Sequence, residues 1–382
     1  MPITILVYAQ DSTGLGHVRR CATIAKALLE RRPDTAVVLA TKSRWPASFG
    51  LGPRFDYLKL PGQVTQAAAT PIERDAEVAA VRGLRRALLR EAVTHLRPRL
   101  ILVDNEPLGF GGDMLEALDA APRETRIVFG MRDVVDDPER TAQRWSESGA
   151  LEALEQRFDR TIIYGHPDLF DTLGTYDLPA EARTRAIYNG YICASREDVD
   201  IERFREDQGL TGAPFVLVTG GGGGDAISML SMTIEAARRM DPRPRLFLVT
   251  GSLMSPEDQA VVTDLARQDG HIVRTEVDLL AALAAADAVV TMGGYNTLVE
   301  AMMMGRRPIV LPRATHKLEQ LMRAEAFEVH GLVHCLGPEK ASPDVLARAI
   351  EAEVASPTRL DARQYLDLNG RRAAGLLLDL VE

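Results

Sequence analysis

Residues 287–312, DAVVTMGGYNTLVEAMMMGRRPIVLP, predict a complete strand–helix–strand unit. The apolar run at its start predicts a buried strand that ends at Gly293 and Gly294. A helix is expected to begin near Asn296–Thr297, and Pro308–Leu311 predicts the next strand. Strand, glycine turn, helix and strand in this order are typical of a parallel α/β sheet.

The same alternation continues in both directions along the chain. Runs rich in Val, Ile and Leu predict strands at Ile3–Ala9, Ala36–Thr41, Leu100–Asp104, Ile127–Gly130, Thr161–Tyr164, Phe215–Thr219, Leu246–Thr250, His271–Arg274 and Ala288–Thr291. Amphipathic segments predict helices at Val18–Arg31, Ile72–His95, Arg140–Arg157 and Arg359–Leu380. The pattern breaks near residue 195 and then restarts. We therefore expect an α/β protein with two Rossmann-like, doubly wound parallel-sheet domains facing across a cleft, at residues 1–195 and 196–358, and a C-terminal helix at 359–382.

Composition narrows the class of function. The 382 residues carry a net charge of −9, which argues against nucleic acid as a partner. Cys21, Cys193 and Cys335 are far apart and show no metal-ligand spacing, so we expect no metal site. No apolar run approaches the roughly 20 residues of a transmembrane helix, and no secretory signal is visible. We expect a soluble cytoplasmic protein, as a monomer or weak homodimer.

The motif DSTGLGHVRRC at residues 11–21 directly follows the first predicted strand. Its glycines allow a tight turn, and His17 stands at the start of the next helix. A histidine there can act as a general base, contact a phosphate, or only cap or pack at the helix terminus. Arg19 and Arg20 can bind a phosphate, but solvated charges on the helix surface are the expectation.

The second motif is the glycine run in FVLVTGGGGGDA at residues 215–226. Five glycines between a strand and a helix are entropically costly, and they suit a place where backbone approaches a phosphate or sugar closely. A flexible surface loop is the alternative. The next strand ends in VTGS, without the acidic residue that a nicotinamide cofactor's ribose requires. There is also no Lys-Ser/Thr pair of the phosphate-binding loop.

Two predicted helix starts in the second half carry polar groups. The helix after Gly294 offers N–H groups and a positive dipole end to an anion. Glu300, one turn further on, can accept both ribose hydroxyls or can simply complement the helix dipole. Glu319 and Gln320, in THKLEQLMRAEAF at 315–327, suit sugar hydroxyls or a solvated helix start.

Together these motifs resemble nucleotide-sugar glycosyltransferases of the GT-B fold, most closely family 28, which includes the peptidoglycan lipid-intermediate N-acetylglucosaminyltransferase. Three further segments resemble a bacterial branch of predicted glycosyltransferases: LVDNEPLG at 102–109, GMRDVVDDP at 130–138, and YGHPDLF to YNGYI at 164–192. The resemblance covers essentially the whole chain. It implies a GT-B fold with the C-terminal helix packed back toward the N-terminal domain.

The resemblance also implies roles for individual residues. The donor, with a UDP-sugar favoured over other nucleoside-diphosphate sugars, is expected to bind Gly16, Gly220, Gly221, Gly222, Gly223, Val273, Gly293, Gly294, Asn296, Thr297, Glu300, His316, Glu319 and Gln320. The catalytic base is expected among His17, Asp11 and Glu106, with Asp104 and Asp133 as secondary candidates. The family's enzymes need no metal and no cofactor, because helix N–H groups stabilise the departing diphosphate.

The resemblance implies a metal-independent, inverting glycosyltransferase. The N-terminal glycine loop is less glycine-rich than the peptidoglycan enzyme's, and no basic, apolar surface is evident apart from six arginines at 82–99. We therefore expect a soluble small-molecule acceptor. The first motif also resembles a sugar-nucleotide hydrolase of the same fold, in which the histidine activates water. The motifs are also compatible with an epimerase and with a nucleotide-sugar-binding protein without turnover. A nicotinamide-dependent oxidoreductase is a further alternative, and the missing acidic residue for the ribose argues against it.

Overall fold

The computed structural model describes residues 3–9, 16–43, 50, 52–62, 71–195, 199–313, 317–355 and 359–382, with backbone only at 71–74. The chain forms two compact units. The N-terminal unit comprises Met1–Ile192 together with Asp367–Glu382, and the C-terminal unit comprises Cys193–Leu366.

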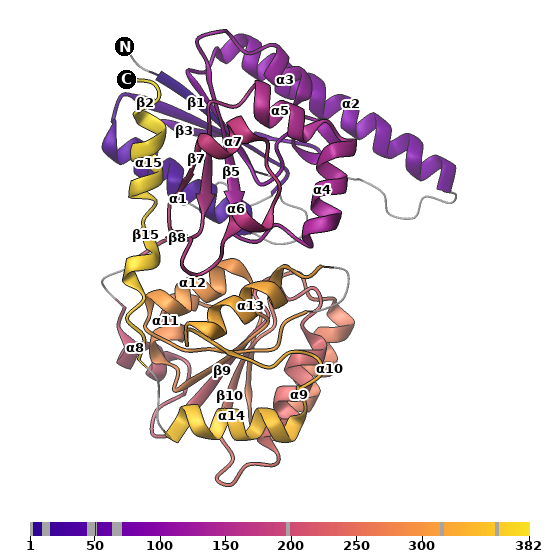
Figure 1. Ribbon diagram of the computed structural model, residues 1–382. Coiled ribbons are helices and arrows are strands. Elements are labelled where there is room, and N and C mark those ends of the chain that lie inside the picture. The colour runs from indigo at the N-terminus through magenta and orange to yellow at the C-terminus, as the bar shows by residue number, and fades with distance from the viewer. Residues whose placement is uncertain are drawn as a thin grey trace. The chain divides into compact units, whose positions relative to one another are not determined.

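The N-terminal unit contains a seven-stranded sheet in the order β3-β2-β1-β4-β5-β6-β7, parallel throughout (Figure 1). Its strands are β1 (Ile3–Ala9), β2 (Thr35–Thr41), β3 (Phe55–Lys59), β4 (Leu100–Asp104), β5 (Arg126–Arg132), β6 (Arg160–Tyr164) and β7 (Ala186–Tyr188). Its helices are α1 (Gly16–Arg31), α2 (Pro71–Leu96), the 3₁₀ turn η2 (Phe110–Gly112), α3 (Leu115–Asp119), α4 (Pro138–Glu147), α5 (Ala150–Gln156), α6 (Thr172–Thr175), α7 (Ala180–Thr184) and α15 (Arg371–Leu378).

The C-terminal unit contains a six-stranded parallel sheet in the order β11-β10-β9-β12-β13-β14. Its strands are β9 (Phe215–Thr219), β10 (Arg245–Val249), β11 (Ile272–Arg274), β12 (Ala288–Thr291), β13 (Ile309–Val310) and β14 (His334–Cys335). Its helices are α8 (Ile201–Asp207), α9 (Ile227–Ala237), α10 (Pro256–Gln268), α11 (Leu279–Ala285), α12 (Tyr295–Met303), α13 (Glu319–Val329), α14 (Pro343–Ala355) and the 3₁₀ turn η3 (Arg363–Tyr365). A separate two-stranded sheet pairs β8 (Tyr191–Cys193) with β15 (Leu366–Leu368).

Both large sheets are doubly wound, which confirms the predicted fold class. In each sheet the strand order reverses once, between β1 and β4 in the N-terminal unit and between β9 and β12 in the C-terminal unit. Every residue of β4, β9 and β12 is buried, as expected of strands covered by helices on both faces. Ligands of such sheets bind beyond the carboxyl ends of the strands at the point of reversal. A functional site is therefore expected at these two places.

Two of the predicted helices are wrong in extent. The segment Arg140–Arg157 is not one helix, because Gly149 adopts a left-handed conformation with φ 74° and separates α4 from α5. The segment Arg359–Leu380 is helical only at α15, since η3 and β15 precede it and Gly370, with φ 66°, lies at the start of the helix.

The C-terminal helix α15 packs along α1, as predicted (Figure 1). Asp367 fixes the start of this segment, because its carboxylate accepts hydrogen bonds from the N–H groups of Arg372 and Ala373 and from Nδ2 of Asn189. Gly370 lies so close to the backbone of Ile24 that a Cβ there would be 3.2 Å from its Cα. The end of the chain is thereby part of the N-terminal unit.

Candidate active site

His17 and Asp104 meet at the point where the strand order of the N-terminal sheet reverses. His17 lies at the start of α1, which follows β1, and Asp104 is the last residue of β4. Nδ1 of His17 is 2.7 Å from Oδ2 of Asp104. The His17 side chain is 15% exposed, whereas Asp104 is fully buried. With Nδ1–H donated to the carboxylate, Nε2 carries the lone pair and can accept a proton.

Arg20 completes this group, contrary to the expectation that it is a solvated charge. It is only 3% exposed, and its Nη2 lies 2.8 and 2.9 Å from the two carboxylate oxygens of Asp104. The same Nη2 lies 3.0 Å from Nδ1 of His17. The cause is that Arg20 follows His17 by three residues, so the two side chains share a face of α1 that is turned toward the buried carboxylate.

Burial and charge act on the two titratable groups of this cluster. Burial lowers the pKa of His17 below its ordinary value against the opposing effect of Asp104, and Arg20 and Arg132 lower it further. Burial alone would raise the pKa of Asp104, but Arg20 and His17 outweigh it and hold that pKa below its ordinary value. The cluster therefore contains an ionised aspartate beside a histidine that is neutral at neutral pH.

Of the other two candidate bases, the structure describes Glu106, whose surroundings differ from those of His17. Glu106 follows β4, and its carboxylate oxygens accept hydrogen bonds from Nη2 of Arg144 at 3.0 Å and from Nε1 of Trp145 at 3.1 Å. Each carboxylate oxygen of Glu106 therefore already has a hydrogen-bond donor. Asp11 lies outside the described residues.

A second buried charge cluster lies at the same sheet edge and has a structural explanation. Nε of Arg85 donates to Oδ2 of Asp113 at 2.6 Å, and the Tyr8 hydroxyl donates to Oδ1 at 2.9 Å. The hydroxyl also accepts the N–H of Phe110 at 2.9 Å. These bonds hold the turn η2 against β1. Gly109 has φ 69°, and a Cβ there would lie 2.2 Å from Asp113, so only glycine fits.

In the C-terminal unit, the glycine run lies between β9 and α9 and packs against the end of β10. Gly223 is buried with φ 87°, and a Cβ there would lie 1.7 Å from the carbonyl oxygen of Thr250. The backbone at Gly221 and Gly222 is exposed, and Gly222 accepts the N–H of Leu253 at 2.9 Å. Close backbone packing therefore accounts for part of the glycine content, and the exposed glycines leave backbone open to a ligand.

We expect Gly223→Ala to lower the free energy of unfolding by about 2 kcal/mol or more, because alanine at this positive φ is strained and its methyl group meets the Thr250 carbonyl. The thermal unfolding midpoint should fall by roughly 4–8 °C. Gly224→Ala is the matched control, since its Cβ would meet nothing closer than Leu253 at 3.7 Å. Equal midpoints for the two variants would contradict the packing argument.

The start of α12 lies beside the glycine run. Gly294 precedes the helix in an extended conformation and, as a glycine, supplies no side-chain cap. Oγ1 of Thr297, in the first turn, would lie 3.7 Å from a Cβ at Gly221. Glu300 is 4% exposed, one turn further along the same helix. The helix start thus presents backbone N–H groups next to exposed glycine backbone, an arrangement suited to phosphate.

The start of α13 completes this edge of the sheet. The backbone of Gln320 lies 3.9 Å from the position of a Cβ at Gly293, and Oε1 of Gln320 accepts the N–H of Arg313 at 3.0 Å. Nη1 of Arg313 lies 2.7 Å from Oδ2 of Asp225, just after the glycine run. Glu319, the first residue of α13, is partly exposed. The structure therefore brings together the predicted donor-binding residues of three loops, while His316 lies outside the described residues.

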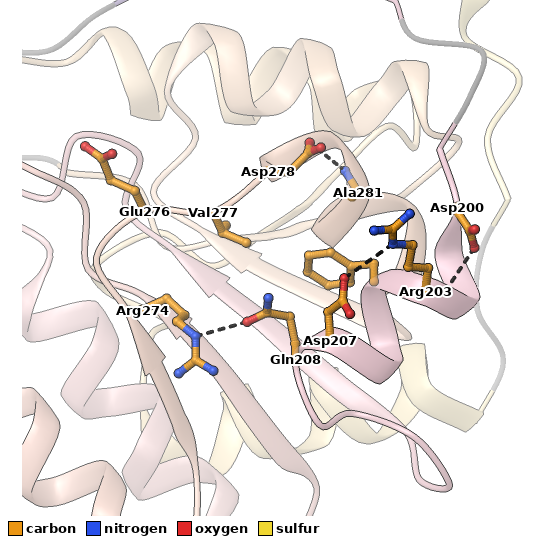
Figure 2. A pocket seen from close by; sticks show the side chains of 10 residues that line it. Asp200, Arg203, Asp207, Gln208, Arg274, Glu276, Val277, Asp278 and Ala281 are labelled. Carbon is orange, nitrogen blue, oxygen red and sulfur yellow. Dashed lines mark hydrogen bonds and ion pairs between the residues drawn. The ribbon is translucent and has the colours of Figure 1, made fainter.

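Two predicted donor-binding residues lie outside this group of loops. Gly16 is the first residue of α1 in the N-terminal unit, and Val273 lies in the edge strand β11. A pocket of about 450 Å³ lies between α8 and the turn that follows this strand, and its lining side chains are drawn in Figure 2. Nε of Arg274 donates to Gln208 across it at 3.0 Å, and Asp278 accepts the N–H of Ala281 at the start of α11. Val277 adds an apolar side chain to its wall. The contact of this strand with a nucleobase stays a prediction.

Two features are absent from the part of the chain that the structure describes. No described cluster of three or more His, Cys, Asp or Glu side chains is arranged to hold a metal ion. Among the helices of the described ranges, none is both long and apolar enough to cross a membrane.

Residues 215–369 match the family model described as the glycosyltransferase family 28 C-terminal domain. This range contains β9 with the glycine run, the start of α12 and the start of α13. An uncharacterized glycosyltransferase of Methanopyrus kandleri is 30% identical over 53% of this chain and 56% of its own length. The chain thus aligns with about half the length of the first curated relatives it matches.

Other similarities extend over the whole chain. A UDP-N-acetylglucosamine–N-acetylmuramyl-(pentapeptide) pyrophosphoryl-undecaprenol N-acetylglucosamine transferase of Desulforudis audaxviator is 24% identical over 99% of this chain and 97% of its own. The solved structure of a UDP-glucosyltransferase from Polygonum tinctorium aligns with a TM-score of 0.64 at 16% identity, covering 100% of this chain and 99% of that one. The similarity to glycosyltransferases of the GT-B fold is confirmed by sequence and by fold.

Proposed function

The chain carries a glycosyltransferase family 28 C-terminal domain, and from this premise we propose that it is a metal-independent, inverting glycosyltransferase that uses a nucleoside-diphosphate sugar, UDP-sugar favoured. The observation that carries the proposal is the extent of the family match, because residues 215–369 include the glycine run and both helix starts at the carboxyl edge of the C-terminal sheet. The names of two relatives, a UDP-N-acetylglucosamine-dependent transferase and a UDP-glucosyltransferase, support this donor class.

In this proposal the C-terminal unit binds the donor. The N–H groups at the start of α12 and the exposed backbone of Gly221 and Gly222 receive the diphosphate. The buried carboxylate of Glu300 accepts the ribose hydroxyls, and Glu319 and Gln320 at the start of α13 contact the sugar. As negative charge develops on the departing diphosphate, the positive end of the α12 dipole stabilises it.

His17 in the N-terminal unit is the proposed general base. Nε2 takes the proton from the acceptor's nucleophilic group, whose lone pair attacks the anomeric carbon while the bond from that carbon to the diphosphate oxygen breaks. Attack from the face opposite the leaving group inverts the anomeric configuration. Asp104 holds Nδ1–H, fixes the tautomer of the imidazole and stabilises the imidazolium that forms.

Stabilisation of the leaving group by helix N–H groups supports metal independence. The sequence contains one Asp-x-Asp triplet, Asp198-Val199-Asp200. The carboxylate of Asp200 accepts the N–H of Arg203 at 2.9 Å and caps α8, which gives that residue a structural role. Asp198 lies outside the described residues.

The proposed acceptor is a soluble small molecule. A lipid acceptor and water are the two alternatives that an experiment has to distinguish from it. The curated relative from Desulforudis audaxviator is named for transfer to a pyrophosphoryl-undecaprenol lipid. Water in place of the acceptor would make the same His17 base that of a hydrolase. Purified protein is incubated with UDP-, GDP- and dTDP-sugars, alone, with soluble acceptors and with a lipid diphosphate, and nucleoside diphosphate release is followed. Release that needs a soluble acceptor supports the proposal, whereas equal release without any acceptor would replace transfer by hydrolysis.

We expect UDP, and not NAD, to raise the thermal unfolding midpoint, by an amount equivalent to about 2.7 kcal/mol at 100 times the Kd.

Glu300→Gln should weaken UDP binding roughly 10- to 100-fold, because the charged acceptor for the ribose hydroxyls is lost. Titration calorimetry measures both proteins. Glu325→Gln on the exposed face of α13 is the matched control. Unchanged affinity in Glu300→Gln would remove this residue from the proposed donor site.

A further inference from the structure

Arg20 is a buried cation beside the proposed base that the mechanism above does not use. Its guanidinium bonds to both oxygens of Asp104 and also approaches Nδ1 of His17. An arginine that is 3% exposed carries a large desolvation cost unless its charge is balanced. Asp104 balances it, and the group is therefore a compact chain of arginine, aspartate and histidine.

The guanidinium of Arg20 also packs against an aromatic ring of the N-terminal sheet. The guanidinium carbon lies 4.8 Å from the centre of the Tyr164 ring, at the end of β6. Gly130 of β5 lies between, in register with Asp104, and a Cβ there would be 2.1 Å from the Tyr164 hydroxyl oxygen. The missing side chain at Gly130 thus makes room for the ring that stacks on Arg20.

We propose that Arg20 is the positioning residue of His17: it clamps Asp104 and balances its charge, so that His17 remains a neutral base at and below neutral pH. The inference rests on the proposed role of His17 as the base. Arg20 has no contact with the substrate in this proposal. It acts on the protonation state of His17 through Asp104.

The charges that face His17 come from three elements. Asp104 on β4 favours the imidazolium, while Arg20 on α1 and Arg132 on β5 oppose it. Nε of Arg132 donates to Oδ1 of Asn105 at 2.8 Å, and the ring of Tyr164 on β6 packs against the guanidinium of Arg20. Without Arg20, an unbalanced buried carboxylate 2.7 Å from Nδ1 would draw a proton onto His17. The imidazolium cannot accept a proton from an acceptor.

The first test is independent of any enzymatic activity. The full chain with isotope-labelled histidine is titrated by NMR, and the His17 signal is assigned by its loss in His17→Gln. Arg20→Gln is expected to raise the pKa of His17 by about one unit or more. Arg19→Gln, one residue earlier on the same helix, should leave it unchanged. Arg20→Lys keeps the charge and should restore most of the wild-type value. An unchanged pKa in Arg20→Gln overturns the proposal, and if that variant does not fold, a raised pKa in Arg20→Lys overturns it as well.

The second test uses the pH profile of kcat/KM with the donor and acceptor identified by the release experiment. In Arg20→Gln the acid limb should move up by the same amount as the NMR pKa, so that activity lost at pH 7 returns at higher pH. A loss that is equal at every pH would mean a merely structural role and would overturn the proposal. A raised NMR pKa in a protein that turns over no nucleotide sugar would support the Arg20 inference while rejecting the proposed function.

Discussion

Replacing His17 by glutamine is expected to reduce turnover by roughly 10²- to 10⁴-fold, the usual contribution of a general base. Glutamine keeps polarity and similar length at the start of α1, but it cannot accept the proton that Nε2 is proposed to take. The donor is bound by residues of the C-terminal unit in this proposal. UDP affinity should therefore stay within about twofold of the wild type, within the precision of titration calorimetry.

The matched control is His95→Gln. His95 lies in the last turn of α2, its side chain is 78% exposed, and its partner Glu91 is also exposed. Its replacement should change neither turnover nor affinity for UDP. Turnover in His17→Gln close to that of the control would remove the base role from His17 and return attention to Glu106 and Asp11.

The fold followed from the sequence because buried parallel strands leave a plain signal. Strands β1, β4, β9 and β12 begin and end where their apolar runs predict, and each is buried along nearly its whole length. The short strands β3, β7, β8, β14 and β15 were not predicted; β8 and β15 have three residues each. β3 and β7 lack a continuous buried apolar run, and β14 has only two residues. The break between α4 and α5 was not predicted either. Gly149 adopts a left-handed conformation there, and the sequence alone does not reveal the φ angle of a single glycine within a helical pattern.

The site was predictable in position but not in its pairing. His17 follows the first strand, and the glycine turns follow β9 and β12, so their place at the carboxyl edge of each sheet was expected. The bond between Asp104 and Arg20 joins residues 84 positions apart, and no local pattern contains it. Two signals were nevertheless present: an aspartate ends the apolar run LILVD, and an arginine lies three residues after His17. A carboxylate at the end of a fully buried strand requires a cationic or N–H partner.

Asp104→Asn is expected to have the second large effect, on both turnover and stability. Asparagine can present its amide to Nδ1 and stabilise the wrong tautomer of His17, so turnover should fall about 10³-fold or more. It also leaves the buried guanidinium of Arg20 without a counter-charge, which should cost about 3 kcal/mol of unfolding free energy. Both quantities are measured on the full chain, turnover at a temperature where the variant is folded.

The stability difference between the wild type and Asp104→Asn is expected to depend on pH. Because the pKa of folded Asp104 lies below the unfolded value of about 3.9, its ionised form stabilises the fold above that pH. That contribution is lost as the pH falls through the folded pKa, so the stability difference between wild type and Asp104→Asn should shrink below about pH 4. Asp113→Asn, which also removes a fully buried aspartate from an arginine pair, is the control and should retain turnover. If both variants lose turnover equally, the effect of Asp104 comes from folding and not from its bond to His17.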